Sequence, residues 1–186
     1  MPKYRRPKIT GACVFFTVKL AQPGSALLTD EVDRLREAVR QTRKERPFAI
    51  DAWVVMPDHL HCVWTLPAGD RDFSTRWGAI KSRFTRSLRD DGRVGFHPTA
   101  AKRLGHPVGW NPTLRKSASK VSKGDSGIWQ RRFWEHHIRD EAEYWAYVRY
   151  CWFNPIKHGF VLHPQDWPYS SVHFDDRFAV DIDLTP

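Results

Sequence analysis

The chain has 186 residues, of which 41% are hydrophobic, 13% aromatic and 27% charged; this composition excludes intrinsic disorder and predicts one folded domain. Lysine and arginine number 30 against 21 acidic residues, which gives a formal net charge of +9. Such a surplus favours DNA or RNA as the partner, with an anionic membrane surface second. No run of about 18 apolar residues exists, so we expect no transmembrane helix. Cys13, Cys62 and Cys151 lie in apolar runs without a CxxC pair, and we expect them to be reduced and buried.

Strands are predicted where β-branched and aromatic residues cluster, and helices where apolar residues recur at helical spacing. In the first half of the chain we expect a basic arm over 1–11, a strand over 12–20, a helix from a Thr29-Asp30 cap to before Pro47, and strands over 48–56 and 59–66. A helix over 73–88 is then followed by a basic Gly/Pro/Ser-rich insertion over about 90–126. The last part should hold a short strand within 128–138, a helix from Asp140 to Phe153 ended by Asn154-Pro155, and a packed tail over about 160–186. This order predicts a single α+β domain over 1–186, with a ferredoxin-like antiparallel sheet covered by helices on one or both faces.

The first chemical motif is His59-Leu60-His61, on the third predicted strand. Positions i and i+2 of a strand project to the same face, so two imidazoles there can share one divalent metal ion. Two histidines on a half-buried strand that bind nothing are the competing interpretation. The motif alone does not decide between the two.

The second motif is Tyr150 with Asn154, one turn apart on one helical face. A tyrosine can act as a nucleophile where a nearby cation or metal ion favours its phenolate. An amide oxygen one turn away could complete a metal site with the two histidines. The competing interpretation is that the tyrosines of this helix only pack it against the sheet.

The combination of these motifs in a small, basic, aromatic-rich domain is what a metal-assisted tyrosine nuclease needs. The chain resembles the REP-associated tyrosine transposases, a branch of the IS200/IS605-like single-tyrosine (Y1) transposases within the HUH endonucleases. The resemblance extends from Tyr4 to Ser171 and is carried by the segments 52–61, 64–67, 129–139, 150–159 and 166–171.

The resemblance implies a ferredoxin-like HUH core that cleaves and joins single-stranded DNA with Mg²⁺ or Mn²⁺. His59 and His61 match the metal ligands of the family. Tyr150 matches the nucleophile, which leaves a 5′-phosphotyrosine and a free 3′-hydroxyl, and Asn154 stands where related transposases place a third polar ligand. Tyr144 does not match the nucleophile position, nor does Tyr147, and we expect both to be packing residues.

The resemblance also implies a partner, the REP-type palindromic hairpin with a single-stranded foot. The stem needs basic side chains for its phosphates, and the unpaired foot needs stacking surfaces and donors for base edges. We expect the DNA-binding residues to be Tyr4, Arg5, Arg6, Lys81, Arg83, Arg86, Arg131, Arg132, Trp134 and Arg139. Each charge could instead be a solvated surface group, and Trp134 a core residue.

Two alternatives to an active nuclease stay open at this point. One is a non-catalytic, regulatory protein that binds REP hairpins, although such a protein does not need a phenol beside a metal site. The other is an RNA-binding module, which the basic aromatic surface permits. We expect a monomer with Tyr150 acting in cis, because no glycine-rich joint for helix exchange precedes it, and a dimer is the alternative. A cytoplasmic, nucleoid-associated location is expected, since the N-terminus has no apolar signal segment.

Overall fold

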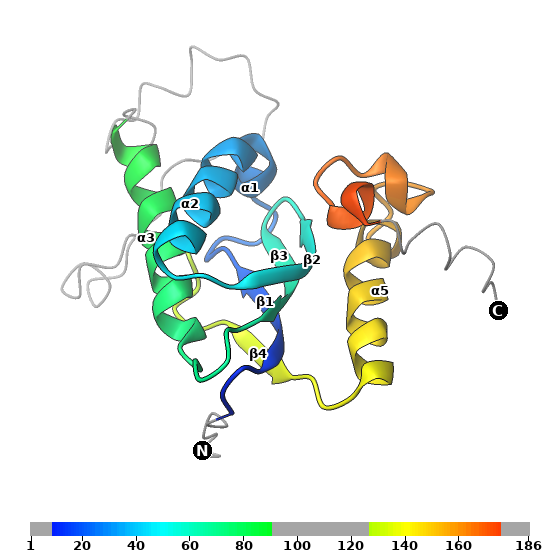
Figure 1. Cartoon of the computed structure of the whole chain (residues 1–186). Coiled ribbons are helices and arrows are strands. Elements are labelled where there is room, and N and C mark those ends of the chain that lie inside the picture. Colours follow the sequence, from blue (N-terminus) through cyan, green and yellow to red (C-terminus); the bar gives the residue numbers. More distant parts are fainter. Residues whose placement is uncertain (1–8, 91–126, 176–186) are drawn as a thin grey trace, which may run out of the picture.

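The computed structural model describes residues 9–90 and 127–175. Most of the predicted basic arm, the insertion and the last part of the tail therefore lie outside the described residues. The elements are β1 (Cys13–Lys19), α1 (Leu27–Asp30), α2 (Val32–Glu45), β2 (Ala49–Val55), β3 (His59–Thr65), α3 (Phe73–Asp90), β4 (Trp134–His137) and α5 (Glu141–Lys157), followed by the 3-10 turns η2 (Pro164–Asp166) and η3 (Ser171–Phe174) (Figure 1). No described helix is long and apolar enough to cross a membrane.

The four strands form one antiparallel sheet in the order β2-β3-β1-β4. Helix α2 connects β1 to β2 and α3 lies between β3 and β4 in the chain, so each helix belongs to a split βαβ unit. The longest ladder joins β1 to β3 and places Thr17 directly opposite His61. The predicted α+β, ferredoxin-like fold is confirmed.

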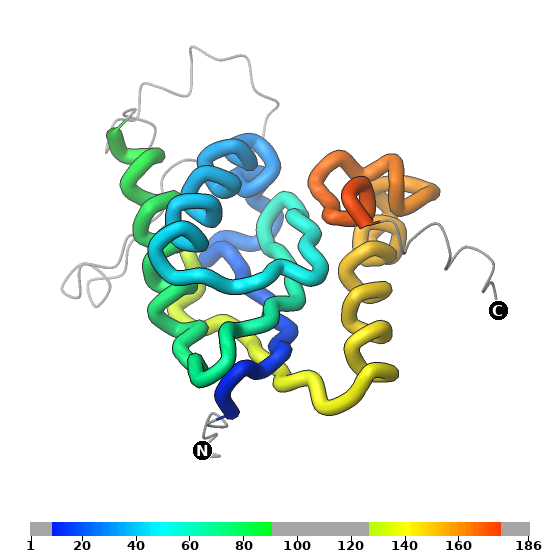
Figure 2. Tube along the Cα trace, in the orientation of Figure 1, coloured from blue at the N-terminus to red at the C-terminus, as the bar shows by residue number. Residues whose placement is uncertain are grey.

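Helices cover both faces of the sheet, and each face has its own core (Figures 1 and 2). Side chains alternate along β3, so Leu60, Cys62 and Trp64 are buried on the face that α2 and α3 cover. There the indoles of Trp64 and Trp77 stack 4.3 Å apart. Val63 points to the opposite face and packs in the second core, which α5 covers with Val148, Cys151 and Trp152.

Helix α5 begins as predicted but ends later. The Asp140 side chain accepts a hydrogen bond from the backbone N–H of Glu143, which caps the helix. The predicted end at Asn154-Pro155 is wrong, because the helix continues through Pro155 to Lys157. A proline in the last turn removes only one backbone donor there, and the turn that follows satisfies the terminal carbonyls instead.

That turn is a Schellman motif centred on Gly159. The N–H of Phe160 donates to the carbonyl of Pro155, and the N–H of Gly159 donates to that of Ile156. Gly159 has a φ of 71°, in the left-handed region that glycine adopts without strain. The helix end therefore holds His158 and Phe160 in fixed positions.

The predicted cap of the first long helix is also wrong. Thr29 and Asp30 lie within the short helix α1, and the Thr29 hydroxyl donates to the carbonyl of Ala26. Helix α2 then begins at Val32 behind Glu31, which makes no side-chain cap bond. The apolar spacing located the helix correctly, whereas the two polar residues belong to the short helix before it and do not cap it.

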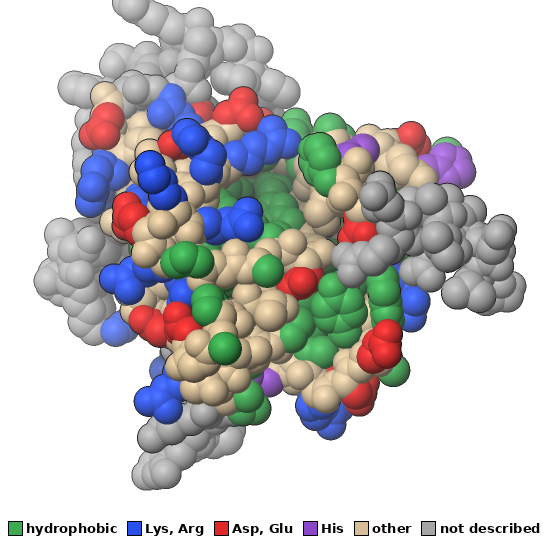
Figure 3. Space-filling view, in the orientation of Figure 1, with side chains coloured by type: hydrophobic (Ala, Val, Ile, Leu, Met, Phe, Trp, Pro, Cys, Tyr) green, Lys and Arg blue, Asp and Glu red, His purple; other side chains and the backbone are tan. Residues whose placement is uncertain are grey.

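The C-terminal segment packs beside the edge strand β2. The N–H of Val55 donates to the carbonyl of Tyr169, and the N–H of Trp53 donates to the Ser171 hydroxyl, 2.9 Å in each case. The Trp167 indole N–H donates to the carbonyl of Val55. These bonds give hydrogen-bond partners to backbone groups of Trp53 and Val55 on the side of β2 that has no neighbouring strand. Between this segment and α2 lies a groove of about 400 Å³ with an apolar floor and arginines along one wall (Figure 3).

Candidate functional site

The two histidines of the HxH motif lie side by side at the start of β3, on the face that α5 covers, with ring centroids 5.0 Å apart. Each uses its Nδ1 atom in a hydrogen bond. His59 Nδ1 lies 2.7 Å from Asp58 Oδ1, and His61 Nδ1 lies 2.9 Å from Thr17 Oγ1. This is how proteins orient metal-ligating imidazoles, because the second nitrogen, Nε2, is then presented to the ion.

Burial keeps both imidazoles neutral. Loss of solvent, with smaller effects of the nearby His59 and Lys19, lowers the pKa of His61 to about 3. Burial also lowers the pKa of His59, against the raising effect of Asp58. A neutral imidazole offers a lone pair, so at neutral pH both histidines are in the state that binds a metal ion.

Tyr150 faces this pair from α5. Its ring lies 5.1 Å from the ring of His61, nearly perpendicular to it, and 5.6 Å edge-on from Phe15 of β1. Tyr150 is 38% exposed, so part of this residue is open to solvent. Lys157, two turns further along α5, places its ammonium 5.3 Å from the Tyr150 ring centroid. The phenol therefore lies between an imidazole and a cation.

Asn154 is the third predicted ligand, and its environment fits that role. It is 1% exposed, and neither its Oδ1 nor its Nδ2 has a hydrogen-bond partner. An unpaired buried amide is costly unless a ligand satisfies it. No cluster of three or more His, Cys, Asp or Glu side chains able to hold a metal ion occurs in the described part of the chain. A metal ion at the histidine pair would therefore need a different kind of third ligand, such as an amide oxygen.

Three neighbours of the site were missed by the sequence prediction: Thr17, Lys157 and His158. Thr17 is 44 residues from His61 in the chain, and only the register of β1 against β3 brings them together. The ring of His158 lies 5.3 Å from that of His59. Both Lys157 and His158 follow Pro155, where the helix was expected to have ended.

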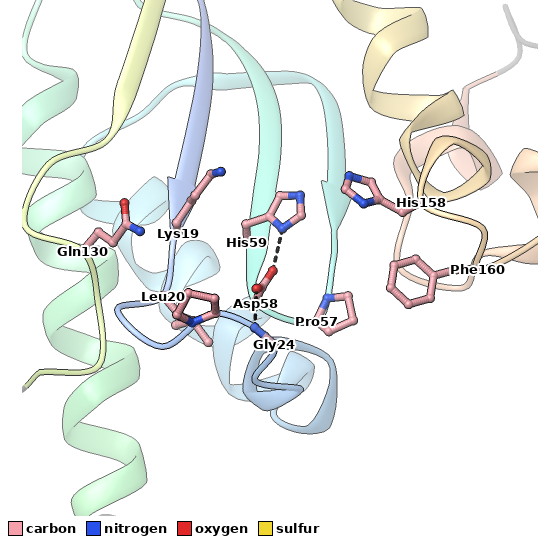
Figure 4. A pocket seen from close by; sticks show the side chains of 10 residues that line it. Lys19, Leu20, Gly24, Pro57, Asp58, His59, Gln130, His158 and Phe160 are labelled. Carbon is pink, nitrogen blue, oxygen red and sulfur yellow. Dashed lines mark hydrogen bonds and ion pairs between the residues drawn. The ribbon is translucent and has the colours of Figure 1, made fainter. Parts of the chain in front are cut away.

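A cavity of about 530 Å³ opens beside His59 (Figure 4). His158 and Phe160 line one wall, and Lys19 and Gln130 lie across from them. The Asp58 carboxylate lies at the bottom, where it contacts His59 and accepts the backbone N–H of Gly24 at 2.7 Å. The site thus continues from Tyr150 past the histidine pair into an open pocket.

The predicted DNA-binding residues fall into several groups. Tyr4, Arg5 and Arg6 lie outside the described residues. Lys81 donates to the carbonyl of Gln130 at 3.0 Å and stands over the rings of Trp129 and Phe133. Arg83 binds the carboxylate of Glu45 and the hydroxyl of Thr42, and so joins α3 to α2. Arg86 is exposed on the same helix.

The remaining predicted contacts surround β4. Arg131 and Arg132 are exposed just before the strand. Trp134 is 52% exposed and stacks on His136, so it is not a core residue. Arg139 holds Glu143 through its guanidinium and its backbone N–H.

The two tyrosines excluded as nucleophiles pack as predicted. The ring of Tyr147 stacks on Phe15 with centroids 4.4 Å apart, and Tyr144 packs against the second core. Trp64 is fully buried, and Trp53 packs at the margin of the first core. His136 binds Glu143 at 2.7 Å, while neither ring nitrogen of His137 has a partner. Cys62 and Cys151 are free and buried, and Cys13 is half-buried.

Comparisons with known proteins identify relatives of the chain. No family model matches the chain. The chain is 41% identical to the "REP-associated tyrosine transposase" of Escherichia coli (strain K12), over 94% of this chain and 85% of that protein. It is 37% identical to a protein of Haemophilus influenzae given the same family name, over 97% and 90%. A solved structure of a REP-associated tyrosine transposase bound to a REP hairpin superposes with a TM-score of 0.71 at 39% identity, over 100% of this chain and 89% of that one.

The fold and these relatives place the protein in the transposase class. Identity near 40% over almost the whole length is too high for a likeness of fold alone, and the matched region includes the histidine pair and Tyr150. The chain belongs to the family of REP-associated tyrosine transposases.

Proposed function

We propose that this protein is a metal-dependent endonuclease and strand transferase that acts on single-stranded DNA beside REP-type hairpins, with Tyr150 as the nucleophile. The observation that carries the proposal is the approach of Tyr150 on α5 to His61 on β3, with 5.1 Å between their rings. Two separate elements bring a phenol to an oriented neutral histidine pair, and an unpaired buried amide, Asn154, lies one helical turn from that phenol.

Each residue has a distinct task in this proposal. His59, His61 and Asn154 would hold Mg²⁺ or Mn²⁺, and the bound ion would polarise the scissile phosphate. The Tyr150 hydroxyl releases its proton to solvent, and its oxygen bonds to phosphorus as the bond from phosphorus to the 3′-oxygen breaks. The 3′-oxygen takes a proton from water, which leaves a 5′-phosphotyrosine and a free 3′-hydroxyl. Attack by another 3′-hydroxyl on the phosphotyrosine reverses these steps and joins two strands.

A REP hairpin is proposed as the DNA partner because a relative of known structure is bound to one. The net charge of +9 supports a polyanionic partner. The exposed Arg86, Arg131, Arg132 and Trp134 offer phosphate contacts and a stacking surface. We propose that the protein works on this DNA as a monomer at the nucleoid.

A second candidate function is a hairpin-binding regulator without catalysis. Its basis is the same likeness to a hairpin-bound relative, since binding alone does not require Tyr150. The contact of Tyr150 with an oriented histidine, one helical turn from the unpaired Asn154 amide, favours catalysis instead, because a pure binder gains nothing from this arrangement.

The test is a covalent-adduct assay. Single-stranded hairpin oligonucleotides are incubated with the protein and Mg²⁺, Mn²⁺ or chelator, then run on a denaturing protein gel. We expect a metal-dependent shifted band that Tyr150→Phe abolishes. Tyr144→Phe is the matched control, since it removes a hydroxyl from the same helix at a packing position and should keep the band. Hairpin binding without an adduct, with several palindromes and both metals, would favour the regulator.

A further inference from the structure

We infer that the cavity beside His59 is a nucleobase pocket that receives the base immediately 5′ of the scissile phosphate, stacked on Phe160. This inference rests on the proposed function and adds to it a residue that determines where the strand is cut. Its basis is the position of the cavity relative to Tyr150, together with the residues that form its walls.

The aromatic wall is built and held in place. Phe160 is 48% exposed although it is a large apolar residue. Its ring lies 5.2 Å from that of Trp167, which packs behind it, and 6.3 Å from that of His158 at an angle of 30°. The Schellman turn fixes both residues through the bond from the Phe160 N–H to the Pro155 carbonyl. A fixed, exposed ring is a platform on which any base can stack.

The opposite wall is polar. Lys19 and Gln130 face His158 and Phe160 across the cavity (Figure 4). An ammonium and a side-chain amide supply donors and an acceptor for the edge of a base whose face lies on Phe160. The volume of about 530 Å³ falls in the range of pockets that bind small organic ligands.

The direction of the strand follows from in-line displacement. The attacking and leaving oxygens lie on opposite sides of phosphorus during phosphoryl transfer. Tyr150 contacts His61, whereas the cavity is lined by His59 and by neither His61 nor Tyr150. The nucleotide in the cavity is therefore on the leaving side, and its 3′-oxygen is the one released.

The experiment is a coupling measurement in the Tyr150→Phe protein, which cannot form the adduct. A set of hairpin oligonucleotides, each with one abasic position around the cleavage site, is titrated against proteins with Phe160 or Phe160→Ala. With Phe160 intact, we expect loss of the base 5′ of the cut to weaken binding about 10-fold. With Phe160→Ala the same loss should have no effect. Phe160→Trp should keep the dependence.

Phe153→Ala is the matched control, because Phe153 is equally exposed on α5 but does not line the cavity. This control should show the same abasic profile as the Tyr150→Phe parent. Equal profiles for Phe160→Ala and the parent at every position would overturn the pocket assignment, even if wild-type protein forms the adduct. Coupling at one position without any adduct in wild-type protein would instead leave Phe160 as the wall of a base-binding pocket and overturn the proposed catalysis.

Discussion

Thr17 shows how one hydroxyl can set the geometry of the site. Its Oγ1 atom, 2.9 Å from His61 Nδ1, fixes the ring so that Nε2 faces the proposed metal ion. We expect Thr17→Val to raise the Mn²⁺ concentration needed for half-maximal adduct formation by about 10-fold or more. The measurement is adduct yield across a Mn²⁺ titration. Thr65→Val makes the same change at the far end of β3, where the hydroxyl binds Asp51, and should leave this concentration unchanged.

Glu143 gives the molecule a pH dependence at the start of α5. Hydrogen bonds from Arg139 lower its pKa to about 2, with help from His136. A carboxylate with a depressed folded-state pKa stabilises the fold above its unfolded pKa near 4.5, and this contribution is lost as pH falls toward 2. We therefore expect Glu143→Gln to be less stable than wild type at pH 7 and the difference to shrink below pH 4.5. Urea unfolding at pH 7 and pH 3 measures both values, and an equal difference at the two would contradict the assignment.

Among the helices, α3 carries one arginine that is engaged by other side chains and one that we propose contacts DNA. Arg83 is engaged by Glu45 and Thr42, so Arg83→Ala should reduce the free energy of unfolding by about 0.5 to 1 kcal/mol. Arg86 is exposed, so Arg86→Ala should leave stability unchanged. It should weaken hairpin binding and reduce the slope of log affinity against log salt by about 1. Thermal unfolding and salt titrations of hairpin binding test both variants. A loss of stability in Arg86→Ala together with a loss of binding in Arg83→Ala would contradict these assignments.

Two glycines, one in the turn that ends α5 and one within α3, predict effects of opposite sign. Gly159 has a positive φ and open space around a would-be Cβ, so Gly159→Ala costs only backbone strain, about 1 kcal/mol. Gly78 lies within α3 with similar open space and no positive φ, so Gly78→Ala should stabilise the protein by about 0.5 to 1 kcal/mol. The expected shifts in melting temperature are a few degrees down and up. A rise for Gly159→Ala would mean that the turn is not as described.

The C-terminal end of α5 shows why the sequence predicted only part of the candidate site. Chemically rare residues at short spacing, such as His59 with His61 and Tyr150 with Asn154, can be paired from local geometry alone. Lys157 could not, because a proline normally ends a helix, whereas α5 continues past Pro155 and ends only at the Schellman turn of Gly159. Strand and helix positions followed from apolar spacing, whereas the Thr17 contact required the pairing of β1 with β3.

At the scale of the whole molecule, Tyr150 and His61 of the candidate site come from the same chain. Tyr150 and His61 meet because α5 packs on its own sheet through the second core. We therefore expect Tyr150→Phe mixed with His59→Ala to form no more adduct than either protein alone. Circular dichroism of each variant is the control that it is folded. Adduct restored on mixing would show that tyrosine and histidines are shared between subunits, as in a dimer.

The second core also limits how far Tyr150 can move. Val148, Cys151 and Trp152 on the inner side of α5 are all fully buried against the sheet, so displacing the helix would expose a large apolar surface to water. On the proposed mechanism, a DNA strand joined to Tyr150 is therefore attached to a part of the protein that does not move. The free 3′ end of the DNA must then be the part that moves in strand exchange, because it has to reach the phosphotyrosine before the two strands can be joined.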